Sequence, residues 1–441
     1  MFATKSTANE TLNLPSQPKN EDLNMTNPTV AFVGLGYIGL PTAVVMANSG
    51  VDVTGVDVNE ANVERINRGE VTIVEPGLEE ELKQAIASGN FRATTTQVHA
   101  QTYIIAVPTP FTEGYNVDMK YIYSAAEAIA PQLKGDELVI LESTSPPLTT
   151  KKMADKILEL RPDLVADGAD NPDDKPVVYF AHCPERILPG KAMEELRTND
   201  RIIGGQTEEA TKRATAIYAT FCKAELLPTN DVTAEMAKLT ENSFRDVNIA
   251  FANELSLIAD NLGINVWELI ELANHHPRVN ILQPGPGVGG HCIAVDPWFI
   301  VASDPENSKL IRTARIVNDA KPQWVIEKVI EAVADNNASK VAVLGLAFKA
   351  DIDDLRESPA LNIAVDLADE LENIQFLVAE PNVADLPKRL RGFNNAEIMD
   401  YDKAIDAADV ILLLVDHKEF KALDPECLSD KSVIDTKGLW K

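Results

Sequence analysis

The chain has 441 residues, too many for one ordinary hydrophobic core, and at roughly 150 residues per domain this length predicts about three domains. Apolar residues make up 45% and charged residues 24% of the sequence, a composition typical of globular proteins rather than of disordered or fibrous chains. The 40 basic and 68 acidic residues give a formal net charge of −28, which opposes binding to nucleic acids and to anionic membrane surfaces.

The chain begins with a polar segment, residues 1–27, that we expect to be a disordered tail. It has no apolar core of the length that a signal peptide needs, and no later segment is long and apolar enough to cross a membrane. The four cysteines, at positions 183, 222, 292 and 427, form no CxxC pair, so their spacing supports neither a disulfide framework nor a structural zinc site. We therefore expect a cytoplasmic protein with reduced thiols and no membrane insertion.

After this tail, apolar runs alternate with helical patterns as far as about residue 228. A buried-type strand at 29–33 meets a glycine and is followed by a helical pattern that ends near residue 48. Further elements are predicted as strands at 51–56, 103–107, 138–141 and 177–181, with helical stretches such as 119–129 between them. This alternation predicts a parallel, doubly wound sheet in a first domain of residues 28–228.

The first strand–helix connection carries the pattern GxGxxG in Gly34, Gly36 and Gly39, with Asp57 at the end of the next strand. The first glycine permits a tight turn, the second lets a pyrophosphate approach the backbone, and the third lets the helix pack closely. The N-terminus of the helix supplies positive charge to the phosphates. Asp57 would accept hydrogen bonds from ribose hydroxyls and repel a 2′-phosphate, which favours NAD over NADP. A glycine-rich turn without a ligand is the weaker interpretation, because strand, helix and acidic residue are all in register.

The pattern becomes helical in the middle of the chain and returns to alternation near its end. A helix without Gly or Pro is predicted at 230–262, and two more are predicted at 266–274 and 310–334. A strand–glycine–helix pattern restarts at 340–345, and later strands are predicted at 374–379, 410–415 and 432–434. We therefore expect a central helical domain at 229–322 and a second, smaller α/β domain at 323–441.

A rigid loop in the middle region ends on a thiol. Residues 284–292 read Pro-Gly-Pro-Gly-Val-Gly-Gly-His-Cys, and a backbone so rich in glycine can approach a ligand closely. Most free cysteines are small buried hydrophobes, but Cys292 ends this loop four residues before Asp296. This position makes Cys292 a candidate nucleophile.

The long predicted helix carries three polar side chains on one face. Lys238, Asn242 and Arg245 follow one another at helical spacing. Such a face is usually solvated, but the flanking apolar residues, Met236 and Phe244 among them, predict that much of this helix is buried. In that case Lys238 and Asn242 need partners.

The sequence around these residues resembles the UDP-glucose and GDP-mannose dehydrogenase family. The resemblance rests on KLTENSF at 238–244, on GGHC at 289–292 with Asp296, and on GLAFK at 345–349 with DLRES at 354–358. It covers nearly everything after residue 28. Within the family, the string from His276 to Phe299 most resembles the branch that oxidises UDP-N-acetylmannosamine.

The resemblance implies a four-electron oxidation of a sugar at C6, with two NAD and one water and without a metal. Cys292 would add to an aldehyde, and water would release the acid from a thioester. Lys238 would favour a thiolate-like Cys292, transfer protons and, with Asn242, stabilise the oxygen that gains charge. Asp296 and Glu185 are candidates for orienting the thiol or the hydrolytic water. The product would serve bacterial surface polysaccharide synthesis, such as that of enterobacterial common antigen.

The resemblance also implies a fold, binding residues and a partner. The fold is an N-terminal doubly wound Rossmann-like domain, a central all-helical dimerisation region and a C-terminal Rossmann-like sugar-nucleotide-binding domain. A UDP-sugar carries pyrophosphate charges that basic residues must neutralise locally. The positions that match substrate-binding residues are Arg186, Ile187, Lys238, Asn242, Arg245, His276, Arg278, Gly289, Phe348, Lys349 and Lys437. Those that match cofactor contacts are Gly34, Gly36, Tyr37, Ile38, Gly39, Asp57, Thr109, Thr144, Thr150 and Arg356. A homodimer through the long helix is expected, with the Arg278 loop reaching the neighbouring site.

Three alternatives stay open. The substrate could be another sugar nucleotide, such as UDP-N-acetylglucosamine, UDP-glucose or GDP-mannose, because a few pocket contacts distinguish these sugars. A two-electron β-hydroxyacid dehydrogenase would share the dinucleotide domain and the helical Lys and Asn, but it would not need Cys292. A sugar-nucleotide sensor that has lost catalysis is a third reading, and the presence of Asp57, Lys238 and Cys292 argues against it.

Overall fold

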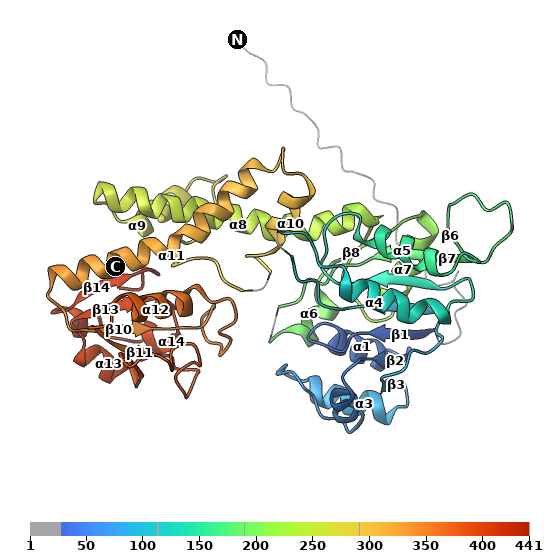
Figure 1. Cartoon of the computed structure of the whole chain (residues 1–441), viewed down its shortest axis with the longest axis horizontal. Coiled ribbons are helices and arrows are strands. Elements are labelled where there is room, and N and C mark those ends of the chain that lie inside the picture. The colour runs from blue at the N-terminus through green and yellow to red at the C-terminus, as the bar shows by residue number, and fades with distance from the viewer. Residues whose placement is uncertain (1–27, 113, 189, 291, 441) are drawn as a thin grey trace, which may run out of the picture.

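The computed structural model describes residues 28–112, 114–188, 190–290 and 292–440. The tail predicted at 1–27 lies outside the described residues. Two α/β domains stand at opposite ends of the molecule, and long helices run between them (Figure 1). None of the described helices is both long and apolar enough to cross a membrane.

The N-terminal domain contains a nine-stranded sheet in the order β3-β2-β1-β4-β5-β7-β8-β9, with β6 paired to β7. Its strands are β1 (Thr29–Val33), β2 (Asp52–Val56), β3 (Phe91–Thr94), β4 (Thr102–Ile105), β5 (Leu138–Leu141), β6 (Val165–Ala166), β7 (Val177–His182), β8 (Arg201–Gly205) and β9 (Leu226–Asn230). The pairs are parallel except β7 with β8, which is antiparallel. The sheet predicted to be parallel is therefore mixed, because the segment between β7 and β8 returns the chain in the opposite direction.

Helices cover both faces of this sheet. In β1, Val30 and Phe32 belong to one buried cluster and Ala31 and Val33 to another, so each face of the strand has its own core. The helices are α1 (Gly39–Asn48), α2 (Glu60–Asn67), α3 (Leu78–Ala87), α4 (Lys120–Ile129), η1 (Ala130–Gln132), α5 (Thr149–Leu160), α6 (Ala192–Thr198) and α7 (Glu208–Tyr218). The strand order reverses between β1 and β4, which is where sheets of this kind bind ligands at the carboxyl ends of their strands.

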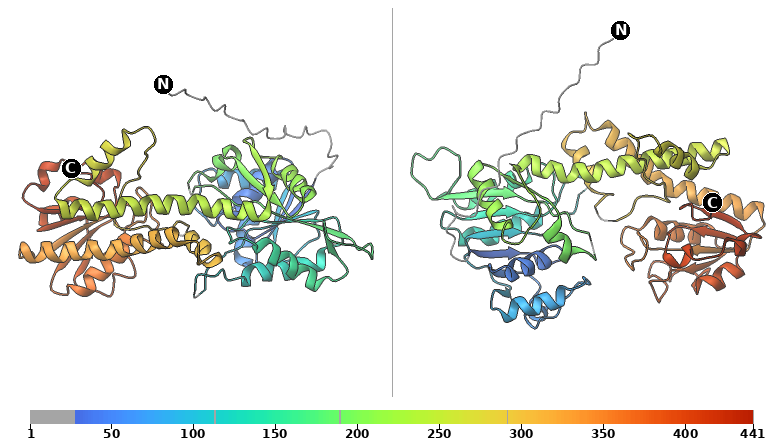
Figure 2. Two further views of the ribbon diagram at one scale, coloured as in Figure 1. Left: turned by 90° about the horizontal axis from the view of Figure 1, so that it is seen from above. Right: turned by 180° about the vertical axis from the view of Figure 1, so that it is seen from behind.

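The central region is helical and is dominated by α8 (Asp231–Leu262). The Asn230 side chain accepts a hydrogen bond from Thr233 N at the start of α8, and Gly263 ends the helix in a left-handed conformation. The other helices of this region are α9 (Val266–Asn274), α10 (Asp296–Ser303) and α11 (Lys309–Asp335). Seen from above, α8 and α11 run side by side along the molecule (Figure 2).

Two details of the central region differ from what the sequence predicts. Met236 and Phe244 are 36% and 67% exposed, although Leu239 between them is fully buried. The predicted boundary between residues 322 and 323 falls inside α11. The half of α11 before this point carries Arg315 and Asn318, which bond to α8, whereas Val325 and Val329 in the second half belong to the core of the C-terminal domain.

The C-terminal domain contains a parallel five-stranded sheet in the order β12-β11-β10-β13-β14. Its strands are β10 (Lys340–Leu344), β11 (Gln375–Ala379), β12 (Ala396–Ile398), β13 (Val410–Leu413) and β14 (Ser432–Asp435). Its helices are α12 (Pro359–Glu370), α13 (Tyr401–Ala407), α14 (Lys418–Lys421) and η2 (Pro425–Leu428). The carboxyl ends of the central strands β10 and β13 lead to the loops that carry Phe348 and Asp416.

Candidate active site

The glycine-rich turn after β1 has the shape that a bound dinucleotide needs. Gly34 has φ 96°, and a side chain there would collide with Ala106 O, while one at Gly39 would collide with Gly34 O. Nothing lies within 4 Å of a Cβ placed on Gly36, so the space over the middle of the turn is open. Asp57 Oδ2 accepts a hydrogen bond from Leu35 N at 2.9 Å, which fixes its carboxylate beside the turn. These residues fit the pyrophosphate and ribose of NAD.

Tyr37 and Ile38 follow in the same turn, and Arg356 of the C-terminal domain lies near them. Tyr37 Oη donates to Glu75 Oε2 at 2.5 Å. Burial and Glu75 raise the pKa of Tyr37, and the Arg356 charge lowers it. Tyr37 of the N-terminal domain and Arg356 of the C-terminal domain are therefore close enough to interact electrostatically. The Arg356 side chain is 82% exposed and pairs with Asp354 at 2.7 Å.

The three threonines predicted to contact the cofactor have different surroundings. Thr109 Oγ1 donates to the Thr144 carbonyl at 2.7 Å, which ties the segment after β4 to the segment after β5. Thr150 is fully buried at the start of α5, and its backbone N and Oγ1 both donate to Glu235 Oε1 at 2.7 Å. Thr150 therefore connects α5 to α8.

Four of the predicted catalytic residues come together where α8, α10 and the glycine-rich loop meet. Asn242 Nδ2 donates to Asp296 Oδ2 at 2.6 Å, and both side chains are buried. Asp296 N bonds to Cys292 O at 2.9 Å, so α10 starts directly from the cysteine turn. Lys238, one helical turn before Asn242, is close enough for its charge to lower the pKa of both Cys292 and Asp296. His291 lies outside the described residues.

The protonation states in this group are set by opposing effects. Burial raises the pKa of Asp296 to about 6, and Asn242 and Lys238 oppose that rise. Burial and the Asp296 charge raise the pKa of Cys292, and Lys238 only partly compensates. The thiol form of Cys292 is therefore favoured over the thiolate at neutral pH, chiefly because the surroundings of the sulfur disfavour its charged form, although the residue as a whole is exposed.

Glu185 is held in a buried ion-pair network next to this group. Arg201 on β8 reaches Glu185 Oε2 at 2.8 Å and Glu142 Oε1 at 3.6 Å, and all three side chains are buried. The other Glu185 oxygen accepts from the backbone N of Arg186 at 2.6 Å. Burial and the Glu185 charge raise the pKa of Glu142 to about 8, so one of the two carboxyls is protonated at neutral pH.

Arg186 joins this segment to α8. Its guanidinium pairs with Glu241 at 2.8 Å, beside Asn242, and it also donates to the Asp200 carbonyl at 2.9 Å. The neighbouring Ile187 packs against the core of the N-terminal domain.

A cavity of about 330 Å³ lies on the C-terminal domain side of the glycine-rich loop. Phe348, Lys349 and Lys437 line it together with Pro286 and Gly287. Lys437 Nζ stands 3.5 Å from Asp416, so the cavity has a mixed charge. A side chain on Gly289 would collide with Pro359, which explains the glycine where the loop crosses the C-terminal domain.

Arg245, His276 and Arg278 lie on the outside. All three are exposed, and within the described ranges no hydrogen bond joins their side chains to the Cys292 group. Arg278 N donates to His276 Nδ1 at 3.3 Å in the loop after α9, and that loop is tied to α8 through Asn248. This placement leaves them available to a neighbouring molecule.

Comparison with known proteins decides the family. Three models of the UDP-glucose/GDP-mannose dehydrogenase family match: the NAD binding domain at residues 28–222, the central domain at 232–320 and the UDP binding domain at 342–441. The chain belongs to this family. It is thus an NAD-dependent nucleotide-sugar dehydrogenase, which sets aside the β-hydroxyacid dehydrogenase and the sensor.

Individual family members match over almost the whole chain. UDP-N-acetyl-D-mannosamine dehydrogenase of Salmonella typhi is 55% identical over 427 residues, which cover 95% of this chain and 100% of the relative. NDP-N-acetyl-D-galactosaminuronic acid dehydrogenase of Ralstonia nicotianae is 51% identical over 412 residues, which cover 93% and 96%. The structure of UDP-D-ManNAc dehydrogenase from Pyrococcus horikoshii matches with a TM-score of 0.81 and 38% identity, over 94% of this chain and 96% of that chain.

The structure adds residues to this family site that the sequence pattern did not single out. Arg201 pairs with both Glu185 and Glu142, Glu241 pairs with Arg186, and Glu235 bonds to Thr150. The partners are separated by 16 to 85 residues in sequence, so no local spacing joins them. The one available signal was chemical, because buried acidic residues on α8 require partners.

Proposed function

We propose that this enzyme oxidises UDP-N-acetyl-D-mannosamine at C6 to the uronate through a thioester on Cys292. The observation that carries the proposal is the group of Cys292, Lys238, Asn242 and Asp296 at the junction of the helices. A simple two-electron oxidation needs no thiol at this place, whereas a four-electron oxidation needs a nucleophile that holds the aldehyde. The names of the relatives support the sugar.

Each residue of the group then has a chemical part. NAD, when bound in the turn around Gly36, supplies the hydride acceptor for both oxidation steps. Cys292 adds to the C6 aldehyde, and its proton passes to Asp296, whose pKa of about 6 leaves it mostly ionised at neutral pH. Lys238 and Asn242 stabilise the oxygen that gains charge during this addition. Water then cleaves the thioester, which releases the acid and restores the thiol.

The hydrolytic water is better assigned to Asp296 than to Glu185. Both Glu185 oxygens have partners, Arg201 and the backbone N of Arg186. Asp296 accepts from Asn242 with Oδ2, and no hydrogen bond among the placed residues reaches its Oδ1. We therefore infer that Glu185 positions Arg186 near the substrate, with Arg186, Lys349 and Lys437 facing the pyrophosphate.

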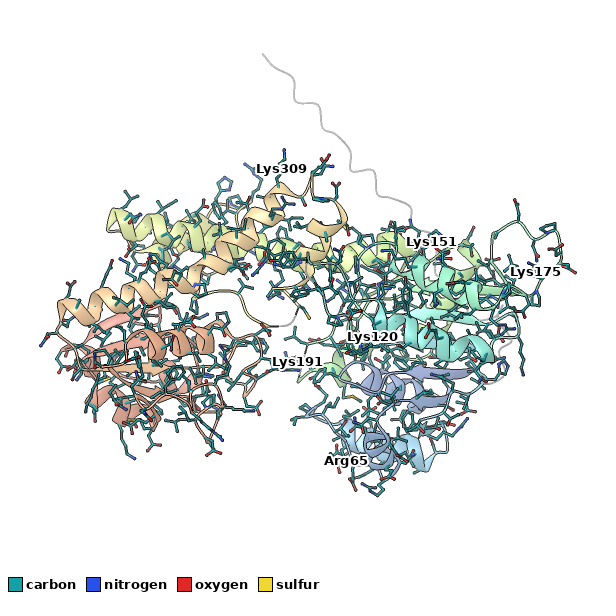
Figure 3. All side chains as sticks on the ribbon, in the orientation of Figure 1. Arg65, Lys120, Lys151, Lys175, Lys191 and Lys309 are labelled. Atoms are coloured by element: carbon teal, nitrogen blue, oxygen red, sulfur yellow. The ribbon has the colours of Figure 1, made fainter. Side chains whose placement is uncertain are left out.

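A homodimer is part of this proposal. Apolar side chains form an exposed stripe along α8, here called the α8 stripe: Met236, Phe244, Phe251, Ile258 and Leu262. Pairing through the α8 stripe would bury these residues and bring Arg278 of one subunit towards the other. The basic side chains labelled in Figure 3 lie on the N-terminal domain and at the start of α11, apart from the α8 stripe. We also propose a cytoplasmic location and a role in surface polysaccharide synthesis.

The stoichiometry of NADH tests the mechanism. We expect two NADH for each UDP-N-acetylmannosamine consumed, and a ratio of one would remove the thioester scheme. Cys292→Ser should bind both ligands but release acid at least about 10³-fold more slowly, because the nucleophile is lost. Cys427→Ser, at an exposed thiol in the C-terminal domain, is the matched control and should turn over normally.

The likeness to the Ralstonia enzyme favours a second candidate sugar of the galactosamine series. Side-by-side assays of UDP-N-acetylmannosamine, UDP-N-acetylgalactosamine, UDP-N-acetylglucosamine and UDP-glucose decide between them. We expect the highest kcat/KM for the first sugar. A higher value for any other would replace the proposed substrate while leaving the cysteine chemistry in place.

A further inference from the structure

A second cavity, of about 280 Å³, lies between the central helices and the end of the C-terminal sheet. It is separate from the cavity that contains Phe348 and Lys349. Its walls include Trp267, Trp324 and Trp440, which are three of the four tryptophans of the chain. A hollow with so much aromatic surface offers stacking to a flat ring.

One charged side chain in the wall of this cavity has no part in the proposed mechanism. Lys321 on α11 is only 3% exposed. Its Nζ donates to Ser256 Oγ at 2.7 Å and lies 3.5 Å from the centre of the Trp324 ring. Burial lowers the pKa of Lys321 to about 7, with the charge of Asp260 opposing the change. An ammonium in such a place gains from any anion that reaches it.

The other polar groups of the wall already have partners. Asp260 pairs with Lys328 at 3.0 Å, and the Asn265 side chain caps α9. Asp435 accepts from three backbone N–H groups, those of Lys437, Gly438 and Trp440. Ser256 Oγ, which accepts from Lys321, donates to the Asn253 carbonyl. Among the residues that the structure describes, Ser256 is the single hydrogen-bond partner of Lys321. An ammonium has three donors, so it can bond to a further acceptor.

We propose that this cavity is a second ligand site, which takes a planar aromatic molecule with one negative charge. The tryptophans stack on the ring, and Lys321 bonds to the carboxylate. Asp260 and Asp435 work against a ligand with two or more negative charges, which disfavours a nucleoside diphosphate here.

The site lies apart from the α8 stripe. Ser256 and Asp260 precede the stripe residues Ile258 and Leu262 by two positions each, which is about 200° around a helix. Dimer formation through the α8 stripe therefore leaves the cavity uncovered by that face. Pro284 and Gly285 form part of the cavity wall, and they begin the loop that ends on Cys292. A ligand would thus touch the catalytic loop from behind.

Calorimetric titration of the full chain with 2-naphthoate tests the proposal. With NAD and UDP both present at saturation, we expect one site per subunit, accompanied by a change in tryptophan fluorescence. The neutral analogue 2-naphthamide should bind at least tenfold more weakly. Absence of binding at millimolar 2-naphthoate, or its displacement by NAD or UDP, would overturn the proposal.

Two lysines on one helix provide the matched variants. Lys321→Met keeps the length of the side chain and removes the charge, and it should weaken 2-naphthoate binding at least tenfold. Lys309→Met, at the exposed start of the same helix and outside the cavity wall, should change the affinity less than twofold. Equal binding by wild type and Lys321→Met would refute the role of the ammonium. If Lys321→Met fails to fold, Trp324→Leu should weaken both naphthalene probes.

The pH dependence gives an independent reading. The charged groups that face Lys321 are Asp260 on α8, Lys328 on α11 and Asp435 at the end of β14. In the protein without ligand, the Lys321 ammonium loses its proton as pH rises through about 7. The affinity for 2-naphthoate should therefore fall above that pH, towards about tenfold per pH unit. An affinity that is constant from pH 6 to 9 would contradict binding to the Lys321 ammonium.

Discussion

The reactivity of Cys292 depends on two neighbours of opposite charge. Besides desolvation, which is the largest effect and raises the pKa of the thiol, the Asp296 charge raises it and the Lys238 charge lowers it. Asp296→Asn should therefore speed the alkylation of Cys292 by iodoacetamide at pH 7.5 by about two- to tenfold, and Lys238→Met should slow it. Mass spectrometry of the Cys292 peptide over time measures both rates.

Cys427 serves as the internal reference for this experiment. It is exposed in the C-terminal domain, far from α8 and α10 in the sequence, so its alkylation rate should be the same in all three proteins. Slower alkylation of Cys292 in Asp296→Asn would contradict the inference that the Asp296 charge opposes ionisation of the resting thiol.

Residue types and spacing were enough to predict the central group of the site. Cys292 and Asp296 are four residues apart and Lys238 and Asn242 share a helix face, so local geometry already pairs them. The ionic partners of this group could not be predicted. Arg201 lies on a strand that the pattern does not reveal, and its pairing with Glu185 depends on how β8 returns beside β7. The net pKa of Cys292 also depends on burial, which a sequence does not contain.

At the scale of elements, the joint between α5 and α8 is a single carboxylate. Glu235 accepts from Leu148 N, Thr150 N and Thr150 Oγ1, and it is fully buried. Burial raises the pKa of Glu235 to about 7, although these hydrogen bonds oppose that rise. The start of α5 is therefore held by a carboxyl group of α8 that titrates near neutral pH.

This joint predicts a pH-dependent stability. Because folding raises the pKa of Glu235 from its usual 4.5, the native state keeps a proton that the unfolded state releases, so this group destabilises the fold as pH rises from 4.5 through 7. The side chain of Glu235→Gln cannot ionise. As pH rises over this range, the unfolding free energy of the variant should therefore increase by about 1–3 kcal/mol relative to that of wild type. Urea denaturation at several pH values measures the difference. For the control Glu127→Gln, on the surface of α4, the unfolding free energy should depend on pH as it does in wild type. The same pH dependence in Glu235→Gln would contradict the raised pKa of Glu235.

Most elements were predictable and a few were not, for physical reasons. Buried strands such as β1 and β5 have continuous apolar runs, and α8 has helical spacing with a clear end at Gly263. β8 and β9 were missed because β8 has two glycines, whereas β9 has no buried residue and contains Pro228. Strand direction comes from the path of the connection, so the antiparallel β7–β8 pair could not be inferred from composition.

For the whole molecule, the α8 stripe makes a prediction about assembly. Phe251, in the middle of the α8 stripe, is 52% exposed in the single chain. Phe251→Asp should weaken self-association by about a hundredfold or more, because a buried carboxylate would face its own copy at the centre of the interface. Analytical ultracentrifugation over a dilution series measures it.

Val58 provides the control for the assembly experiment. It is 98% exposed in the N-terminal domain, away from α8, so Val58→Asp adds the same charge without touching the α8 stripe. It should sediment like wild type. Monomeric wild type, or an unchanged dimer in Phe251→Asp, would exclude the α8 stripe as the interface.

The helix α8 presents the α8 stripe on one side and Lys238 and Asn242 on another: Lys238 follows the stripe residue Met236 by two positions, and Asn242 precedes the stripe residue Phe244 by two. A helix turns as one body, so an exchange of bulk on the outer side moves the amine and the amide on the inner side. Substitutions in the α8 stripe should therefore change the turnover rate, whereas similar substitutions on an ordinary surface would not. If the proposed dimer forms through the α8 stripe, a descendant of this chain that lost its partner would also have to readjust the positions of Lys238 and Asn242.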